Sequence, residues 1–148
     1  SAAGLMSLGI QVTQGISKYL DALNGRREDL DAVRRKNDAL GHILDSVKST
    51  VSSPQPLNRS HAAVADCIAT CEGELEGLET LVAQLAGCKN AQTWKARLQN
   101  QSKKLSYPFK QSKVQQLSQR LDQVNGTLQV ALGGLGMYVS ILLLIGRF

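Results

Sequence analysis

The sequence predicts an all-α protein: an antiparallel helical bundle of four to five helices in a single domain, residues 1–148, with an apolar N-terminal helix and a long C-terminal helix. Apolar residues recur at alternating steps of three and four in separate stretches, which is the spacing of helices buried against one another. Short turn-forming segments join these stretches. Aromatic residues make up only 4% of the chain, so we expect a core of Leu, Val, Ile and Ala.

The apolar N-terminal helix is expected over residues 1–23, and residues 1–17 carry no charged side chain. Most of its apolar side chains fall on one stripe. The stripe begins with Leu5, Leu8, Val12 and Ile16. Met6 and Ile10 lie off the stripe. The stretch lacks the pattern of a signal peptide, and it is too short and polar to span a membrane. Two interpretations stay open: a central buried helix, and a helix that docks in the bundle and can leave it for a membrane.

A row of small residues at four-residue spacing follows another side of this helix. It consists of Gly9, Thr13 and Ser17. Such a row lets helices approach closely in lipid. It is also compatible with tight packing inside a soluble bundle.

Two more helices are expected at about residues 26–52 and 58–86. Asn37 is a polar residue at a seam position of the first of these, where such a residue fixes register at some cost in stability. The loop at residues 52–58 separates them, and a turn at Gly87 ends the second.

The long C-terminal helix is expected to begin at Pro108 or Phe109, because proline ends the preceding helical segment and is tolerated at a helix start. Its buried seam is Val114, Leu117, Leu121, Val124, Leu128, Ala131 and Leu135. Residues 133–148 form an atypical apolar tail, in which we expect helix over 135–146. The tail should bury Leu135, Tyr138, Leu142 and Ile145. Glycine is the poorest helix former after proline, so Gly133, Gly134 and Gly136 are the natural break point.

Charge is distributed unevenly along the chain. Residues 53–88 hold five acidic side chains against Arg59, whereas residues 89–122 hold eight basic side chains against Asp122. This pattern favours an antiparallel pair of oppositely charged helices, and it also fits a basic face that contacts anionic lipid. The candidate lipid-binding residues are Lys95, Arg97, Lys103, Lys104, Lys110 and Lys113.

Motifs of catalysis and of cofactor binding are absent from the sequence. The three cysteines are interpreted as small apolar residues in a reducing compartment. A metal site would require His42 or His61 together with converging ligands, and the spacing does not favour one. The basic stretch lacks interleaved aromatic residues, which argues against nucleic-acid binding. We therefore expect a protein that is not an enzyme and that has no cofactor, no metal and no nucleic-acid partner.

One stretch resembles a known family. A tryptophan, a leucine four residues later, a basic run into Tyr-Pro-Phe-Lys, and a leucine repeat resemble the fungal N-terminal domain of STAND (NLR-like) receptors, in the HeLo-like group of cell-death domains. The matching positions are Trp94, Leu98, Tyr107, Pro108, Phe109, Lys110, Leu117, Leu121, Leu128, Ala131 and Leu132. The opening GLMSLGIQVTQGISKYLDAL also resembles that of the family, whereas the apolar tail departs from it. We expect Trp94, Tyr107 and Phe109 to cluster at one end of the bundle.

The resemblance implies a membrane-targeting cell-death effector domain of a fungal immune receptor. Its N-terminal helix, through Leu5, Met6, Leu8, Ile10, Val12 and Ile16, would engage membrane lipids on activation. The resemblance further implies a homo-oligomer, a downstream nucleotide-binding domain in the same or a partner chain, and movement from the cytoplasm to the plasma membrane. Two alternatives stay open: a non-enzymatic oligomerisation or adaptor bundle, and a protein anchored by its C-terminal residues.

Overall fold

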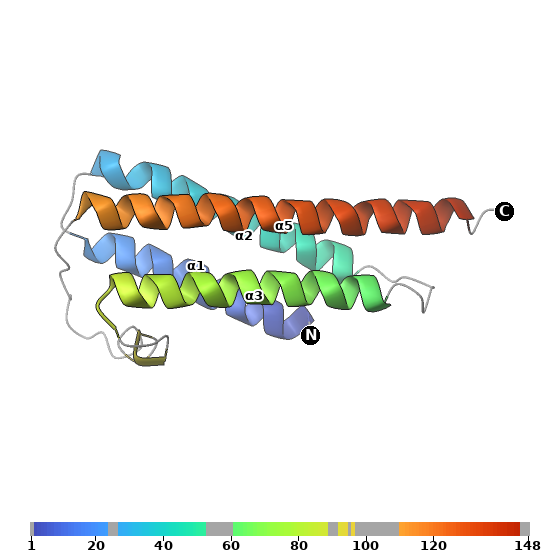
Figure 1. The fold of residues 1–148 in the computed structure, drawn as a ribbon, viewed down its shortest axis with the longest axis horizontal. Coiled ribbons are helices and arrows are strands. Elements are labelled where there is room, and N and C mark those ends of the chain that lie inside the picture. The colour runs from blue at the N-terminus through green and yellow to red at the C-terminus, as the bar shows by residue number, and fades with distance from the viewer. Residues whose placement is uncertain are drawn as a thin grey trace.

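Four long helices make up most of the computed structural model, which describes residues 2–23, 27–52, 61–88, 92–94, 96 and 110–145. They are α1 (Ala2–Ala22), α2 (Arg27–Ser52), α3 (His61–Leu85) and α5 (Gln111–Ile145) (Figure 1). Residues 92–94 and 96, between α3 and α5, are also helical. The described residues form no β-strand. The prediction of an all-α helical bundle is confirmed.

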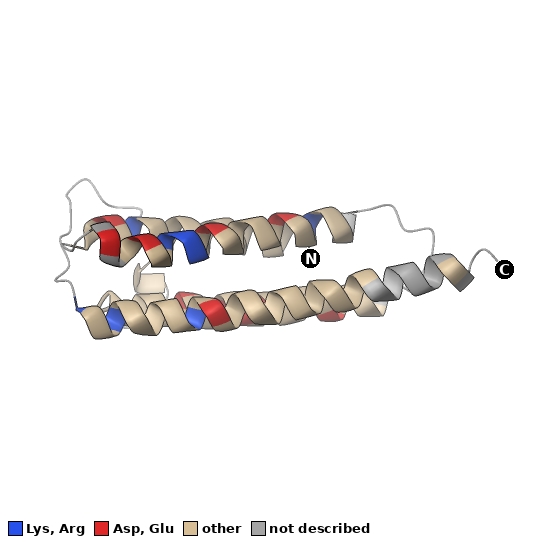
Figure 2. Ribbon diagram, turned by 90° about the horizontal axis from the view of Figure 1, so that it is seen from above, with Lys and Arg blue, Asp and Glu red and all other residues tan. Residues whose placement is uncertain are grey.

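The helices form two antiparallel pairs that pack on each other. The pair α1–α2 makes one layer and the pair α3–α5 makes the other (Figures 1 and 2). Across the layers α1 packs on α3 and α2 packs on α5. Figure 1 shows that the members of each cross-layer pair run in the same direction. The bundle therefore contains parallel as well as antiparallel neighbouring helices. The apolar periodicity of the sequence does not predict which helices run parallel.

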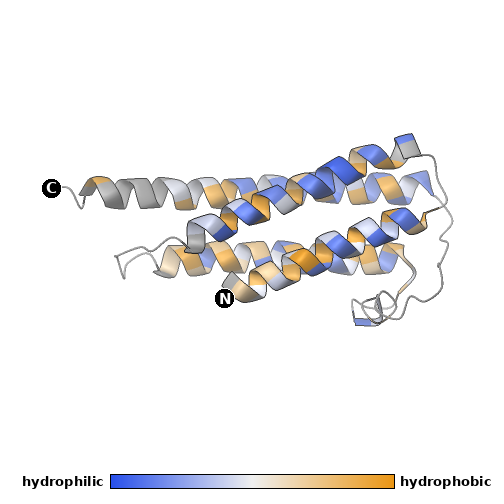
Figure 3. Ribbon diagram, turned by 180° about the vertical axis from the view of Figure 1, so that it is seen from behind, coloured by the Kyte–Doolittle hydropathy of each residue, from blue (hydrophilic) through white to orange (hydrophobic). Residues whose placement is uncertain are grey.

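The core lies along the axis of the bundle and follows the predicted seams. Asn37 is buried at its seam position. The buried residues of α5 are Val114, Leu117, Leu121, Val124, Leu128 and Leu135. Ala131 packs against this core while staying half-buried. Figure 3 shows that hydrophilic residues are frequent along α2, whereas the part of α1 near the N-terminus is mostly apolar or intermediate in hydropathy.

The C-terminus of α3 is closed by a glycine turn. Gly87 has a φ of 79°, a backbone conformation that glycine adopts without steric penalty. The amide of Gly87 donates to the Gln84 carbonyl at 3.0 Å, and the amide of Cys88 donates to the Ala83 carbonyl at 2.8 Å. These two bonds form a Schellman motif, which satisfies the last carbonyls of the helix. The turn predicted at Gly87 is confirmed, and it directs the chain toward Trp94.

Two predictions about α5 are wrong. The helix begins at Gln111, and the Lys110 carbonyl outside it accepts the first turn's hydrogen bonds from Lys113 and Val114. The helix also continues without a break through Gly133, Gly134 and Gly136. Glycine weakens a helix by about 1 kcal/mol relative to alanine but does not remove a backbone hydrogen bond. Leu128 and Leu135, buried on either side of the first two glycines, hold this segment against the bundle.

The end of α5 projects beyond the other three helices (Figure 1). Its 35 residues span about 52 Å at 1.5 Å per residue. Leu135 is buried as predicted, whereas Val130 is 77% exposed and Leu144 is 58% exposed. The helical prediction for 135–145 is confirmed, but the side chains of Tyr138, Leu142 and Ile145 lie outside the described residues. Within the described residues, no helix is both long enough and apolar enough to cross a bilayer.

The continuous α5 predicts the effect of replacing one of its glycines. A Cβ at Gly134 would meet no atom within 4 Å, so Gly134→Ala should raise the free energy of unfolding by up to about 1 kcal/mol. The melting temperature should rise by about 2–4 °C. Gly41→Ala, in a similarly open position of α2, is the matched control. A fall in melting temperature for Gly134→Ala alone would mean that α5 does break at its glycines.

Candidate functional site

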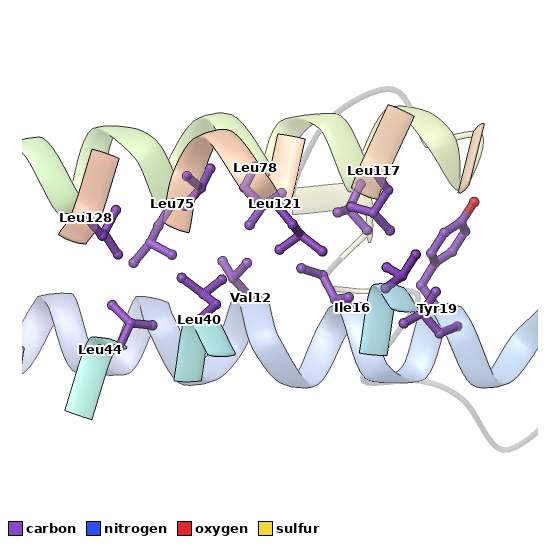
Figure 4. Close-up of a cluster of buried hydrophobic side chains, with 14 of the residues drawn as sticks. Val12, Ile16, Tyr19, Leu40, Leu44, Leu75, Leu78, Leu117, Leu121 and Leu128 are labelled. Atoms are coloured by element: carbon purple, nitrogen blue, oxygen red, sulfur yellow. The ribbon is translucent and has the colours of Figure 1, made fainter. Parts of the chain in front are cut away.

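The apolar stripe of α1 forms one side of the core. Leu5, Val12 and Ile16 have no exposed surface. In Figure 4, Val12, Ile16 and Tyr19 face leucines that come from the other three helices. Those leucines are Leu40, Leu44, Leu75, Leu78, Leu117, Leu121 and Leu128. Full burial of an aliphatic side chain contributes about 1.5–3 kcal/mol, so this stripe is a main source of the bundle's stability.

The row of small residues on α1 faces α2. A Cβ at Gly9 would lie 2.7 Å from Leu44 Cδ1, so the two helices are in close contact at that level. Further along, Asn37 Nδ2 donates to the Thr13 carbonyl oxygen at 3.0 Å and to Ser17 Oγ at 3.3 Å. The small-residue row therefore serves packing inside the bundle. Asn37, predicted to fix register, aligns α2 with α1 through these two bonds.

Gly15, on the other side of the stripe, lies against the ring of Trp94. A Cβ at Gly15 would lie 2.8 Å from Trp94 Cζ2 and 3.2 Å from Cζ3, and closer still to Cη2. Trp94 is only 1% exposed. The residues that follow α3 therefore place the only tryptophan of the chain directly on the backbone of α1.

The remaining predicted membrane-engaging residues lie nearer the surface. Met6 and Leu8 are half-buried, and Leu8 packs against the core. Ile10 is 52% exposed. The six predicted residues thus divide into three that are fully buried, two that are half-buried and one that is exposed.

Only two of the predicted lipid-binding basic residues are described. Lys110 is exposed, and Lys113 Nζ donates to the Leu85 carbonyl oxygen at the end of α3 at 3.2 Å. Both lie at the start of α5, at the end of the bundle opposite the N-terminus of α1 (Figure 1). Lys95, Arg97, Lys103 and Lys104 lie outside the described residues. The same holds for Tyr107, Pro108 and Phe109, so the predicted aromatic cluster is described only at Trp94.

Polar contacts that periodicity does not reveal tie α5 to its neighbours. Lys36 Nζ donates to Ser118 Oγ at 2.6 Å and pairs with Asp122 Oδ2 at 2.8 Å. Asn125 Nδ2 donates to the Lys36 carbonyl oxygen at 3.1 Å. These bonds set the register of α2 against α5.

A further pair joins the acidic helix to the basic one. Arg120 Nη2 lies 3.8 Å from Glu74 Oε2, which links α3 and α5. At Gly77 of α3, a Cβ would lie 2.7 Å from the same guanidinium group. This is one ion pair between the acidic α3 and α5, and most of the basic side chains of residues 89–122 lie outside the described residues.

A polar groove of about 670 Å³ lies between α1 and α2 on the outer surface of their layer. It is lined by Thr13, Gln14, Ser17, Lys18, Asn37, Asp38, Gly41, His42 and Asp45. The groove combines side chains of both signs of charge. Among the residues that the structure describes, no three His, Cys, Asp or Glu side chains converge in a way that would hold a metal ion.

The three cysteines are buried and free. Burial, together with the neighbouring Cys67, raises the pKa of the Cys71 thiol from 9.0 to about 12. Burial also raises the pKa of Cys67. Both thiols therefore stay protonated at neutral pH, whereas a nucleophile or a metal ligand requires the thiolate. This protonation fits the interpretation of these cysteines as small apolar core residues.

Comparison with known proteins assigns no family. No family model matches the chain, and no solved structure matches it. The chain is similar to the azaphilone pigments biosynthesis cluster protein L of Monascus ruber, with 26% identity over 122 residues. The match covers 78% of this chain but only 25% of that protein. The chain thus spans about a quarter of the length of the curated relative it matches.

Two features of the site escape sequence reasoning. Gly15 is one of 13 glycines, and nothing in the pattern marks it as the contact of a tryptophan far along the chain. The polar contacts of Lys36 depend on the parallel packing of α2 and α5.

The buried Cys71 thiol predicts how stability changes with pH. Above pH 9 the unfolded thiol ionises while the folded thiol, whose pKa is about 12, stays protonated, so the free energy of unfolding should fall between about pH 9 and 12. One such group contributes at most about 1.4 kcal/mol per pH unit. Denaturant titrations at several pH values should show a shallower decline for Cys71→Ala. An identical slope in the variant would show that the Cys71 thiol ionises equally in both states.

Proposed function

We propose that this chain is a HeLo-like domain of a longer fungal protein, and that it acts on membranes by releasing α1 from the bundle. The observation that carries the proposal is the composition of α1 in its docked position. Leu5, Val12 and Ile16 supply a complete apolar face to the core, and Ile10 adds an exposed aliphatic side chain on the outside. Since residues 1–17 carry no charge, this part of a released α1 would present an apolar face to lipid with no charged side chain to desolvate, and Lys18 and Asp21 would lie in its last turns.

A released helix of this kind would lie in the membrane interface or insert as part of a homo-oligomer, because its length is marginal for spanning alone. The row Gly9, Thr13 and Ser17 would be freed from α2 and become available for close helix contacts in lipid. Lys110 would remain exposed as a site of attraction to anionic headgroups. The domain would move from the cytoplasm to the plasma membrane in this process.

The match to the Monascus ruber protein covers a quarter of that protein, which is compatible with a bundle that forms one part of a longer chain. In the proposal, a downstream nucleotide-binding domain, in the same or a partner chain, holds the bundle at rest and promotes oligomerisation on activation.

An adaptor bundle is the second candidate. The outer surface of α5 exposes Val130, and its projecting end exposes Leu144. Apolar side chains at such positions are suited to binding another protein. In that case α1 would be an ordinary core helix, and its apolar stripe would never leave the bundle.

A matched pair of substitutions separates the two candidates. Leu8→Glu places a charge on the apolar stripe at a half-buried position, and Gln14→Glu places the same charge on the exposed face of α1. We expect Leu8→Glu to reduce binding to anionic phospholipid vesicles and dye leakage from them by at least about tenfold, since a buried charge in lipid costs about 2.5 kcal/mol or more. Gln14→Glu should retain most of both. Circular dichroism verifies that each variant remains folded.

Vesicle binding should also weaken as salt rises, because headgroup attraction is screened over about 8 Å at 0.15 M ionic strength. If folded Leu8→Glu matched the unmodified chain in leakage, or if the unmodified chain did not bind vesicles, the membrane proposal would be wrong. The adaptor bundle would then be the better explanation.

A further inference from the structure

The contact between Gly15 and Trp94 is a close approach of two segments that lie far apart in the sequence. The ring of Trp94 occupies the space that any side chain at Gly15 would need. Because the obstructing atoms belong to a buried, rigid ring, an added methyl group could not be accommodated by a flexible chain end. The contact therefore requires glycine at this position.

The contact at Gly15 differs from those of the other glycines within the helices. A Cβ at Gly41, Gly73 or Gly126 would meet nothing within 4 Å. A Cβ at Gly9 or Gly77 would meet the end of a flexible side chain, Leu44 or Arg120, whereas a Cβ at Gly15 would meet an aromatic ring. Glycine is a poor helix former, and α1 runs without interruption through Gly15. A glycine in the middle of α1 lowers the stability of the helix, but the Trp94 indole leaves no room for a side chain at this position.

The position of Trp94 in the chain explains why the contact matters for the movement of α1. Trp94 belongs to the residues between α3 and α5, and it packs on α1, the first helix of the chain. If α1 left the bundle, the indole would lose its cover, and if the indole moved away, Gly15 would lose its packing partner. The two movements are therefore energetically coupled.

We propose that Trp94 is a latch that retains α1 in the bundle through its contact with Gly15. Displacement of Trp94 lowers the barrier to release of α1. The proposed function requires the release of α1, the same helix that Trp94 retains. The latch is argued from packing alone, and only its biological role rests on the proposed function.

Gly15→Ala tests the latch, and the single tryptophan is the reporter. The added methyl group should expel the indole, so the emission of Trp94 should shift to longer wavelength. Amide hydrogen exchange in residues 2–22 should accelerate at least about tenfold, while α2, α3 and α5 keep their protection. Gly41→Ala is the matched control, since it adds the same methyl group in open space. It should leave the emission unchanged and should not accelerate exchange in residues 2–22.

A double variant distinguishes displacement of the indole from unfolding of the whole bundle. Trp94→Leu offers a smaller side chain at the contact, so Gly15→Ala combined with Trp94→Leu should be more stable than the sum of the two single effects predicts. Strict additivity, or unchanged emission in Gly15→Ala, would overturn the latch. A shifted emission with unchanged exchange in α1 would overturn it as well, because the indole would then move alone.

Dye leakage from anionic vesicles separates the latch from the proposed function. Faster exchange in α1 together with greater leakage for Gly15→Ala supports both. Faster exchange with no gain in leakage supports the latch and contradicts the membrane function.

Discussion

The need to cover the uncharged first part of α1 governs this structure. Residues 1–17 carry no charge, so this part of the helix is compatible with water only while its apolar stripe packs on other helices. The leucines of α2, α3 and α5 converge on this stripe, and the small residues beside it bring α2 into close contact. The same composition that makes α1 a good core helix also makes it suited to lipid, which is why the bundle and the proposed function depend on one element.

The contacts that hold the helices differ in kind. The helix α5 is tied to α2 through Lys36, Ser118, Asp122 and Asn125, and to α3 through Arg120 and Glu74. By contrast, residues 2–17 have no charged side chain and so form no side-chain ion pair. An ion pair of Arg34 with Asp21 at 2.8 Å joins α2 to the last turn of α1, beyond the uncharged part. Apolar packing, the Asn37 amide and the Trp94 ring are among the contacts that retain the uncharged part of α1.

Much of the fold could be predicted because burial follows periodicity. Leu117, Leu121 and Leu128 are buried where the spacing of three and four places them, and Gly87 ends α3 because only a left-handed residue closes that turn well. The break expected at residues 133–136 was wrong, since helix propensity is weaker than the packing of Leu128 and Leu135. The Gly15–Trp94 contact and the parallel pairing of α2 with α5 were beyond reach, because both depend on how the helix pairs are layered rather than on any local pattern.

Hydrogen exchange measured along the whole chain tests the central claim most directly. If α1 is a separable element, the amides of residues 2–22 should exchange through a partial opening whose free energy is clearly lower than that of α2, α3 and α5. Those three helices should share the free energy of global unfolding. If α1 exchanged only through global unfolding, together with the other helices, it would be an ordinary member of the bundle, and its release as a unit would be contradicted.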